Sequence, residues 1–231
     1  MTLSETLFEK FCSDAEINCV PIKTAKTKTP DYELTIDGQQ IIVEVKEIDR
    51  NKNEQEYDRL IKDRGFAVGT NTPGDRVREK IRKASPQIKK LSARIKPSIL
   101  VLFDRGLKAG HLEPYNIRVA MHGLEQVHIN VPRNPSVSPY ATGMSYGPKR
   151  KMTENDNTSI SAIGGLFTPK PNEIILEVYH NKFAAVPLNP KLLVKYGIRQ
   201  FVLEDEVPGK TAKWKKLSVK HNLIYRLPYE R

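Results

Sequence analysis

Apolar side chains in the first third of the chain recur with the spacing of helices in some segments and of strands in others. Residues 3–15 place apolar side chains three and four residues apart, at Leu3, Leu7, Phe8, Phe11 and Ala15. We therefore predict a helix there, with Ser4 in a position to cap it. Residues 17–22 favour a short strand, and the polar stretch 23–29 has no period and favours a loop.

A hairpin is predicted next, with strands at residues 31–36 and 40–48. Asp37-Gly38 between them is a strong turn signal, because glycine accepts the positive φ of a tight turn. A two-residue turn at that point sets Asp31 opposite a residue at or next to Glu44. Because side chains alternate along a strand, Glu44 and Lys46 are expected on the same face.

The pattern then returns to helices. Residues 49–65 are dense in charge and suit a helix from Glu54 to Lys62, followed by a loop over residues 66–75. One apolar stripe predicts a helix over residues 75–95, formed by Val77, Ile81, Ala84, Ile88, Leu91 and Ile95. Pro86 interrupts that helix and predicts a kink or two abutting helices. Residues 98–103 are continuously apolar, which is typical of a strand buried on both faces.

This order of elements is typical of an α/β core with a mixed sheet. Beyond residue 105 the periodicity is weaker, and strands are predicted at 117–121, 126–131, 159–163, 174–179 and 200–204. Residues 132–158 hold several prolines and glycines and are expected to form a long loop. We expect a core over residues 1–104 and a β-rich elaboration over 105–231 for substrate selection or oligomerisation. The boundary is expected near 105–115, or the chain is a single domain.

Composition narrows the class of protein. The chain has 231 residues, of which 39% are hydrophobic, and it contains no apolar run of about 18 residues. Its start lacks the features of a signal peptide, so a soluble cytoplasmic protein without a membrane partner is expected. Cys12 and Cys19 are expected to be reduced thiols. The formal net charge of +11 favours a polyanionic partner such as nucleic acid.

The hairpin contains the residues with the clearest chemistry. Asp31, Glu44 and Lys46 would meet at one point if the strands pair as predicted. Two carboxylates close together repel each other, and a hard divalent cation such as Mg²⁺ relieves that repulsion. A water bound to the cation could attack a phosphodiester, while the lysine orients that water and offsets charge on the phosphate. The alternative is a surface hairpin with ordinary charged residues. Charge set among apolar strand residues favours the functional interpretation.

Residues 30–46, with Pro30-Asp31 followed by Glu44-Val45-Lys46, resemble the PD-(D/E)xK nuclease superfamily. The likeness extends over roughly residues 1–104. It implies a restriction-endonuclease-like αβββαβ core, with Mg²⁺ or Mn²⁺ held by Asp31, Glu44 and Val45 and the nucleophile assisted by Lys46. The family often adds a glutamate from the first helix. Glu5, at the rim of the apolar stripe, is favoured for that role over Glu9, which lies nearer the polar side.

Basic and aromatic residues outside the hairpin are candidates for nucleic-acid contacts. They are Arg76, Lys80, Lys83 and Gln87 of the 75–95 helix, Lys149, Arg150 and Lys151 of the predicted loop, and Trp214 in the lysine-rich stretch KTAKWKK. The helix residues could equally form a solvated face, and a lone tryptophan is more often a packing residue.

The first hypothesis is an Mg²⁺-dependent nuclease that acts on DNA in restriction, repair, phage biology or defence, with RNA as a further possibility. The second is a nucleic-acid-binding protein with a nuclease-like core and little or no catalysis. The third is a protein-interaction module. Cleavage of a duplex often needs two active sites, so a homodimer is plausible on mechanistic grounds.

Overall fold

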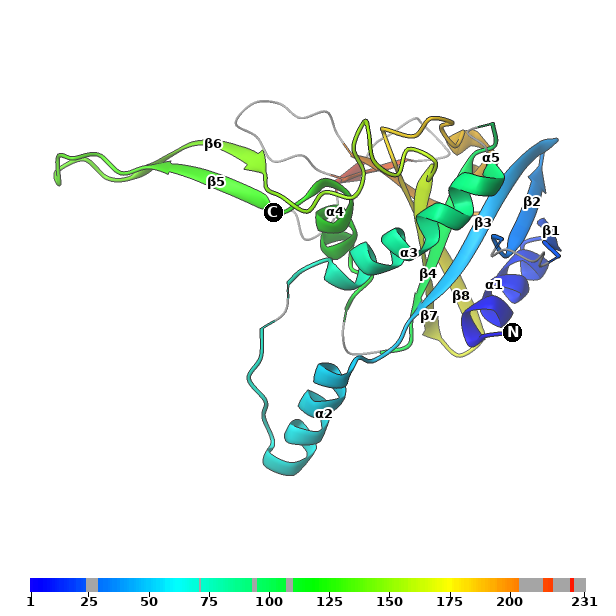
Figure 1. Ribbon diagram of the computed structural model, residues 1–231, viewed down its shortest axis with the longest axis horizontal. Coiled ribbons are helices and arrows are strands. Elements are labelled where there is room, and N and C mark those ends of the chain that lie inside the picture. Colours follow the sequence, from blue (N-terminus) through cyan, green and yellow to red (C-terminus); the bar gives the residue numbers. More distant parts are fainter. Residues whose placement is uncertain are drawn as a thin grey trace.

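The computed structural model describes residues 1–23, 29–70, 72–92, 95–106, 110–203, 214–217 and 225–226 (Figure 1). The first half contains α1 (Leu3–Asp14), β1 (Asn18–Pro21), β2 (Tyr32–Ile36), β3 (Gln39–Ile48), α2 (Lys52–Arg64), α3 (Asp75–Ser92) and β4 (Ser98–Asp104). The second half contains α4 (Pro114–His122), β5 (Glu125–Asn130), β6 (Tyr140–Tyr146), β7 (Ala162–Lys170), β8 (Glu173–His180), α5 (Pro190–Val194), β9 (Arg199–Leu203), β10 (Trp214–Leu217) and β11 (Tyr225–Arg226).

The chain is an α/β protein with a mixed sheet, which confirms the predicted class. The main sheet has the strand order β1-β2-β3-β4-β7-β8-β9-β10-β11, and β5 and β6 form a separate two-stranded sheet. β3, β4 and β7 run parallel, as do β8 and β9, and the other neighbours are antiparallel. Because β4 pairs with β7, the main sheet passes without a break across residue 105. The strands β7 to β11, which follow residue 105, therefore share one sheet with β1 to β4.

The predicted hairpin and its register are confirmed. Asp37 and Gly38 have φ values of 49° and 78°, so both central residues of the turn lie in the left-handed region, as a two-residue hairpin turn requires. β2 pairs with β3 from Ile36 opposite Gln39 to Tyr32 opposite Val43. The same register continued by one residue sets Asp31 opposite Glu44.

Two apolar clusters lie on opposite faces of the sheet, and β3 contributes to both. Val43 and Val45 pack with Phe8 and Phe11 of α1. Ile48 packs on the other face with the α3 stripe, which is formed by Val77, Ile81, Ala84 and Ile88. Figure 1 shows α3 across the front of the sheet. The even-numbered residues of β3, Glu44 and Lys46 among them, thus belong to the face that α3 covers.

Several local predictions need adjustment. Thr2, not Ser4, caps α1, through a capping box with Glu5, because Ser4 already lies within the helix. α3 is one continuous helix that includes Pro86, not two abutting helices, and it ends at Ser92. β4 is buried on both faces and α2 forms, as predicted.

The corrections are larger in the second half of the chain. The strand predicted at 117–121 is wrong, because those residues lie in α4, which Pro114 begins. A short apolar run does not by itself distinguish a strand from a buried helix. The long loop predicted at 132–158 contains β6, and the strand predicted at 159–163 begins only at Ala162. The strands predicted near 126–131, 174–179 and 200–204 are present as β5, β8 and β9.

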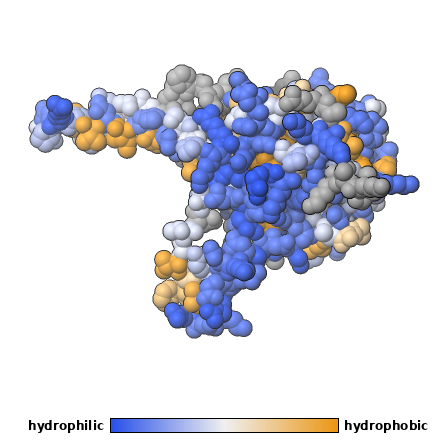
Figure 2. All heavy atoms as spheres, in the orientation of Figure 1, coloured by the Kyte–Doolittle hydropathy of each residue, from blue (hydrophilic) through white to orange (hydrophobic). Residues whose placement is uncertain are grey.

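Two segments project from the body (Figure 1). One, the ribbon, comprises residues 125–146, with β5, β6 and the loop between them. The other, the α2 arm, comprises residues 52–70, and none of its helical residues is buried. Figure 2 shows apolar side chains along the lower edge of the ribbon and near the end of the α2 arm. No helix among the described residues is long and apolar enough to cross a membrane.

Candidate active site

The hairpin brings Asp31, Glu44 and Lys46 together. Asp31 precedes β2, where its backbone N–H donates to Val43 O at 3.1 Å and its Oδ2 accepts from the Val45 N–H at 2.8 Å. Lys46 Nζ lies 4.0 Å from Asp31 Oδ2 and forms an ion pair with Glu44 Oε1. The tight turn thus fixes the positions of all three groups through the register that it imposes.

Glu44 is the most unusual residue of this cluster. Its side chain has no solvent exposure although it carries a carboxyl group, and no hydrogen-bond donor of the described residues reaches its Oε2. Burial raises the pKa of Glu44 to about 7, and the neighbouring Asp31 adds to that rise while Lys46 opposes it. Near neutral pH this carboxyl therefore exchanges between the acid and the carboxylate. A buried, under-coordinated carboxylate costs stability unless a cation or proton occupies it.

Asp31 is perturbed in the same direction for a similar reason. Burial raises the pKa of Asp31, the Val45 N–H and Lys46 lower it, and Glu5 raises it again. The Val45 N–H holds one carboxylate oxygen in place. The site therefore contains two carboxyls whose negative charges are disfavoured by burial, beside the Lys46 ammonium, and Asp31 further disfavours the charge on Glu44.

The three residues lie at the side of an open cleft of about 920 Å³ between the hairpin and α3. Asp31 and Lys46 line the cleft, and Glu44 is buried behind them. The opposite wall comes from one face of α3, which contributes Lys80, Lys83, Gln87 and Lys90. An acidic pair thus meets a basic wall, an arrangement suited to a metal ion beside a phosphate backbone.

The α3 wall contains three of the predicted contact residues and one further basic residue of the same helix, Lys90. Lys83 pairs with Glu79 at 2.5 Å, and Gln87 Nε2 donates to Thr29 O at 3.5 Å. Burial lowers the pKa of Lys80. Lys90 is one of the basic residues of this helix and was not singled out as a contact residue, although it lies one heptad after Lys83 and therefore on the same helical face.

Glu5 and Glu9 have different surroundings. Glu5 lines the cleft and accepts from the Thr2 N–H at 2.7 Å. Glu9 accepts from the Tyr32 hydroxyl at 2.9 Å and is not among the residues that line the cleft. The N-terminus of α1 is tied to β3, because the Ser4 N–H donates to Glu47 Oε1 at 2.7 Å. The structure thus places Glu5 nearer the chemistry, and its role stays a prediction.

The oxygen ligands of Asp31 and Glu44 suit a hard cation that needs only one or two ligands from the protein. No group of three or more His, Cys, Asp or Glu side chains that could hold a metal is found in the described part of the chain. Mg²⁺, however, often takes one or two carboxylates and completes its octahedron with water and substrate phosphate. The Asp31–Glu44 pair, with its buried oxygen that lacks a donor, fits that requirement.

Two other sets of predicted contact residues lie outside the cleft. Arg76 points to the root of the α2 arm, where its Nε lies 3.8 Å from Glu54 Oε1. Lys149, Arg150 and Lys151 follow the ribbon, and the Lys151 N–H donates to Met121 O at 3.2 Å beside the end of α4. None of these residues lines the cleft.

Of the two interpretations of Trp214, the structure confirms the packing residue and contradicts stacking on a base. Its side chain is 1% exposed, its Nε1 donates to Pro114 O at 3.2 Å, and its ring packs edge-on to Tyr179 at 5.1 Å between centroids. The neighbouring lysines in the sequence suggested an exposed ring, but β10 turns the indole inward against α4.

A second cleft, of about 760 Å³, lies at the carboxyl ends of β4 and β7. It is lined mainly by apolar side chains, among them Phe103, Leu112, Leu166 and Phe167. Because its described lining residues include no pair of carboxylates beside a lysine, it does not match the chemistry of the hairpin site.

Comparison with known proteins finds no matching family model, no matching curated protein and no matching solved structure. What the cleft can do therefore follows from its own residues and geometry.

Proposed function

We propose that this chain is a metal-dependent nuclease of the PD-(D/E)xK type, with a restriction-endonuclease-like core, that hydrolyses phosphodiester bonds in DNA. The observation that carries the proposal is the buried Glu44 carboxyl, which lies beside Asp31 and Lys46 with an oxygen that receives no hydrogen bond. Evolution tolerates such a costly arrangement where the charges serve a function, and perturbed carboxyls at a cleft are typical of active sites.

Asp31 and Glu44, with the Val45 carbonyl, would hold Mg²⁺ or Mn²⁺, which supplies an activated water and polarises the phosphate when bound. Lys46 is positioned to orient a nucleophilic water and to offset charge that develops on the phosphate, because its ammonium already contacts both carboxylates. Metal binding would displace the proton that the Glu44 carboxyl retains in part near neutral pH.

The α3 wall would hold the substrate. Lys80, Lys83 and Lys90 face the cleft at helical spacing and could neutralise successive phosphates without reading bases. Among the described residues that line the cleft, Tyr32 is the only one with an aromatic ring, which favours backbone contacts over base stacking. These features favour a duplex, and RNA remains a second candidate substrate.

A catalytically weak nucleic-acid-binding protein is the second candidate function. The direct ion pair between Lys46 and Glu44 favours it, because that contact occupies an oxygen that a metal would use.

Cleavage assays with several nucleic acids distinguish the nuclease from the nucleic-acid-binding protein. The protein would be incubated with supercoiled plasmid, linear duplex, single-stranded DNA and RNA, each with Mg²⁺, with Mn²⁺ and with chelator. Metal-dependent cleavage of DNA is expected. Salt-sensitive DNA binding without cleavage under any of these conditions would instead support the binding function.

A further inference from the structure

The ribbon has one apolar face that nothing in the described structure covers. Val127, Ile129 and Val131 alternate along β5 and just beyond it, and their side chains are 52%, 61% and 71% exposed. The alternate positions Gln126, His128 and Asn130 are polar. The ribbon is thus amphipathic, like a strand pair whose apolar face belongs against another surface. A two-stranded hairpin alone is only marginally stable in water.

Both outer edges of the ribbon are also open, since β5 and β6 pair only with each other among the described strands. Monomeric proteins usually protect such edges with lysine, proline or a covering loop. Neither β5 nor β6 contains lysine or proline. The edges of the two strands are therefore open to pairing with another chain.

The α2 arm presents a second exposed apolar patch. Ile61, Phe66 and Val68 are 51%, 67% and 85% exposed. Figure 2 shows that apolar side chains on the ribbon and at the end of the α2 arm border the same open side of the molecule. The chain that follows α2 packs back against this helix at Gly69. A Cβ added at Gly69 would come within 2.2 Å of the ring of Tyr57.

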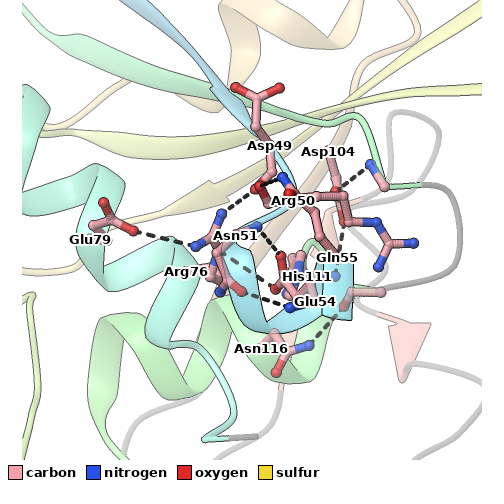
Figure 3. Close-up of polar contacts among 12 residues, drawn as sticks. Asp49, Arg50, Asn51, Glu54, Gln55, Arg76, Glu79, Asp104, His111 and Asn116 are labelled. Atoms are coloured by element: carbon pink, nitrogen blue, oxygen red, sulfur yellow. Dashed lines mark hydrogen bonds and ion pairs between the residues drawn. The ribbon is translucent and has the colours of Figure 1, made fainter. Parts of the chain in front are cut away.

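Polar contacts at its root hold the α2 arm in one orientation (Figure 3). Glu54 completes the capping box with Asn51, and its Oε1 lies 3.0 Å from His111 Nε2 and 3.8 Å from Arg76 Nε. Arg76 also lies 3.8 Å from Glu79 and donates to Asp49 O. This network fixes a helix that has no buried residues, so the patch at its end is presented in a defined place.

Charge indicates what the two projections bind. The α2 arm contains four basic and four acidic residues, and the ribbon contains one arginine and one glutamate, within a chain of net charge +11. Neutral projections are poor ligands for nucleic acid, which requires lysine and arginine against phosphates. They are equally poor membrane inserts, because the open edges of the ribbon would leave backbone groups unsatisfied in lipid.

We propose that the ribbon and the α2 arm form a self-association surface through which two copies of this chain pair about a two-fold axis. Identical neutral surfaces meet without repulsion, and the projections keep the two basic bodies apart. One ribbon face measures roughly 20 by 10 Å, or about 200 Å², whereas a stable dimer buries about 800 Å² from each partner. The α2 arm and the loop of the ribbon therefore have to contribute. This inference does not depend on the nuclease proposal.

Sedimentation velocity of the full chain without nucleic acid, from about 1 µM to about 100 µM, tests the proposal. A dimer is expected that persists in about 0.5 M salt, because salt screens repulsion between the basic bodies. Ile129→Glu and Phe66→Glu should each weaken dimerisation at least about tenfold, because they place charge in an apolar contact. Gln126→Glu, on the opposite face of β5, should change it less than about twofold.

Circular dichroism and thermal unfolding of each variant would verify that the body remains folded, and Val131→Glu is the replacement if Ile129→Glu does not fold. A monomer at all concentrations would overturn the proposal, even if the ribbon variants impaired DNA or vesicle binding. A dimer that Ile129→Glu and Gln126→Glu affect equally would overturn it as well.

Discussion

The pKa of Glu44 predicts a pH-dependent penalty on folding that a single substitution should remove. Its value is about 7 in the folded protein, against 4.5 for an ordinary glutamate. At about 1.4 kcal/mol for each tenfold change in proton affinity, this difference amounts to about 3 kcal/mol. Between these two pKa values the folded protein binds more protons at Glu44 than the unfolded chain does. The contribution of this group to stability is therefore greatest at low pH and is lost as the pH rises through 7.

Glu44→Gln should remove that penalty, since a neutral amide resembles the protonated acid in shape. In chelator, the variant should be more stable than wild type by less than about 1 kcal/mol at pH 5 and by about 3 kcal/mol at pH 8. Urea denaturation at both pH values gives the free energies of unfolding. Glu154→Gln is the control, because Glu154 is exposed, and it should shift stability by less than about 0.5 kcal/mol at either pH.

A stability difference between Glu44→Gln and wild type that is the same at pH 5 and pH 8 would refute the reasoning. It would mean that burial does not raise the pKa of Glu44 in the folded protein. Saturating Mg²⁺ should stabilise wild type and leave the variant unchanged, because only the carboxylate binds the cation.

Three further predictions concern the rest of the account. The affinity for Mg²⁺, measured by calorimetry, should rise from pH 6 to pH 8 as Glu44 loses its proton, and a pH-independent affinity would contradict its role as a ligand. Replacing Lys80, Lys83 and Lys90 together by glutamine should reduce the slope of log affinity for DNA against log salt concentration by about two to three. An unchanged slope would mean that DNA does not bind along the α3 wall. Trp214→Ala should cost about 3–5 kcal/mol of stability in urea denaturation, because it empties a buried site, whereas an unchanged stability would contradict its burial.

The hairpin could be predicted from sequence because its information is local. Asp37-Gly38 fixes the turn type, and the turn type fixes the register that sets Asp31 beside Glu44. The burial of Glu44 was also foreseeable in part, because it interrupts an apolar strand.

Features that depend on distant contacts could not be predicted. α4 contains an apolar run too short to show a helical period, and only Pro114 at its start hinted at a helix. Trp214 is buried by α4 and β8, which lie far away in the sequence. The open face of the ribbon could not be predicted, because apolar alternation in β5 resembles that of any half-buried strand. Only the three-dimensional structure shows that none of the described elements packs against it.

The measurement that tests the central claim most directly is cleavage of duplex DNA in Mg²⁺ by wild type, by Lys46→Ala and by Lys170→Ala. Lys170 is an exposed lysine of β7 outside the cleft and serves as the matched control. Cleavage is expected from wild type and Lys170→Ala, and its loss is expected in Lys46→Ala with DNA affinity kept within a few-fold. Cleavage by Lys46→Ala at the wild-type rate would contradict the account.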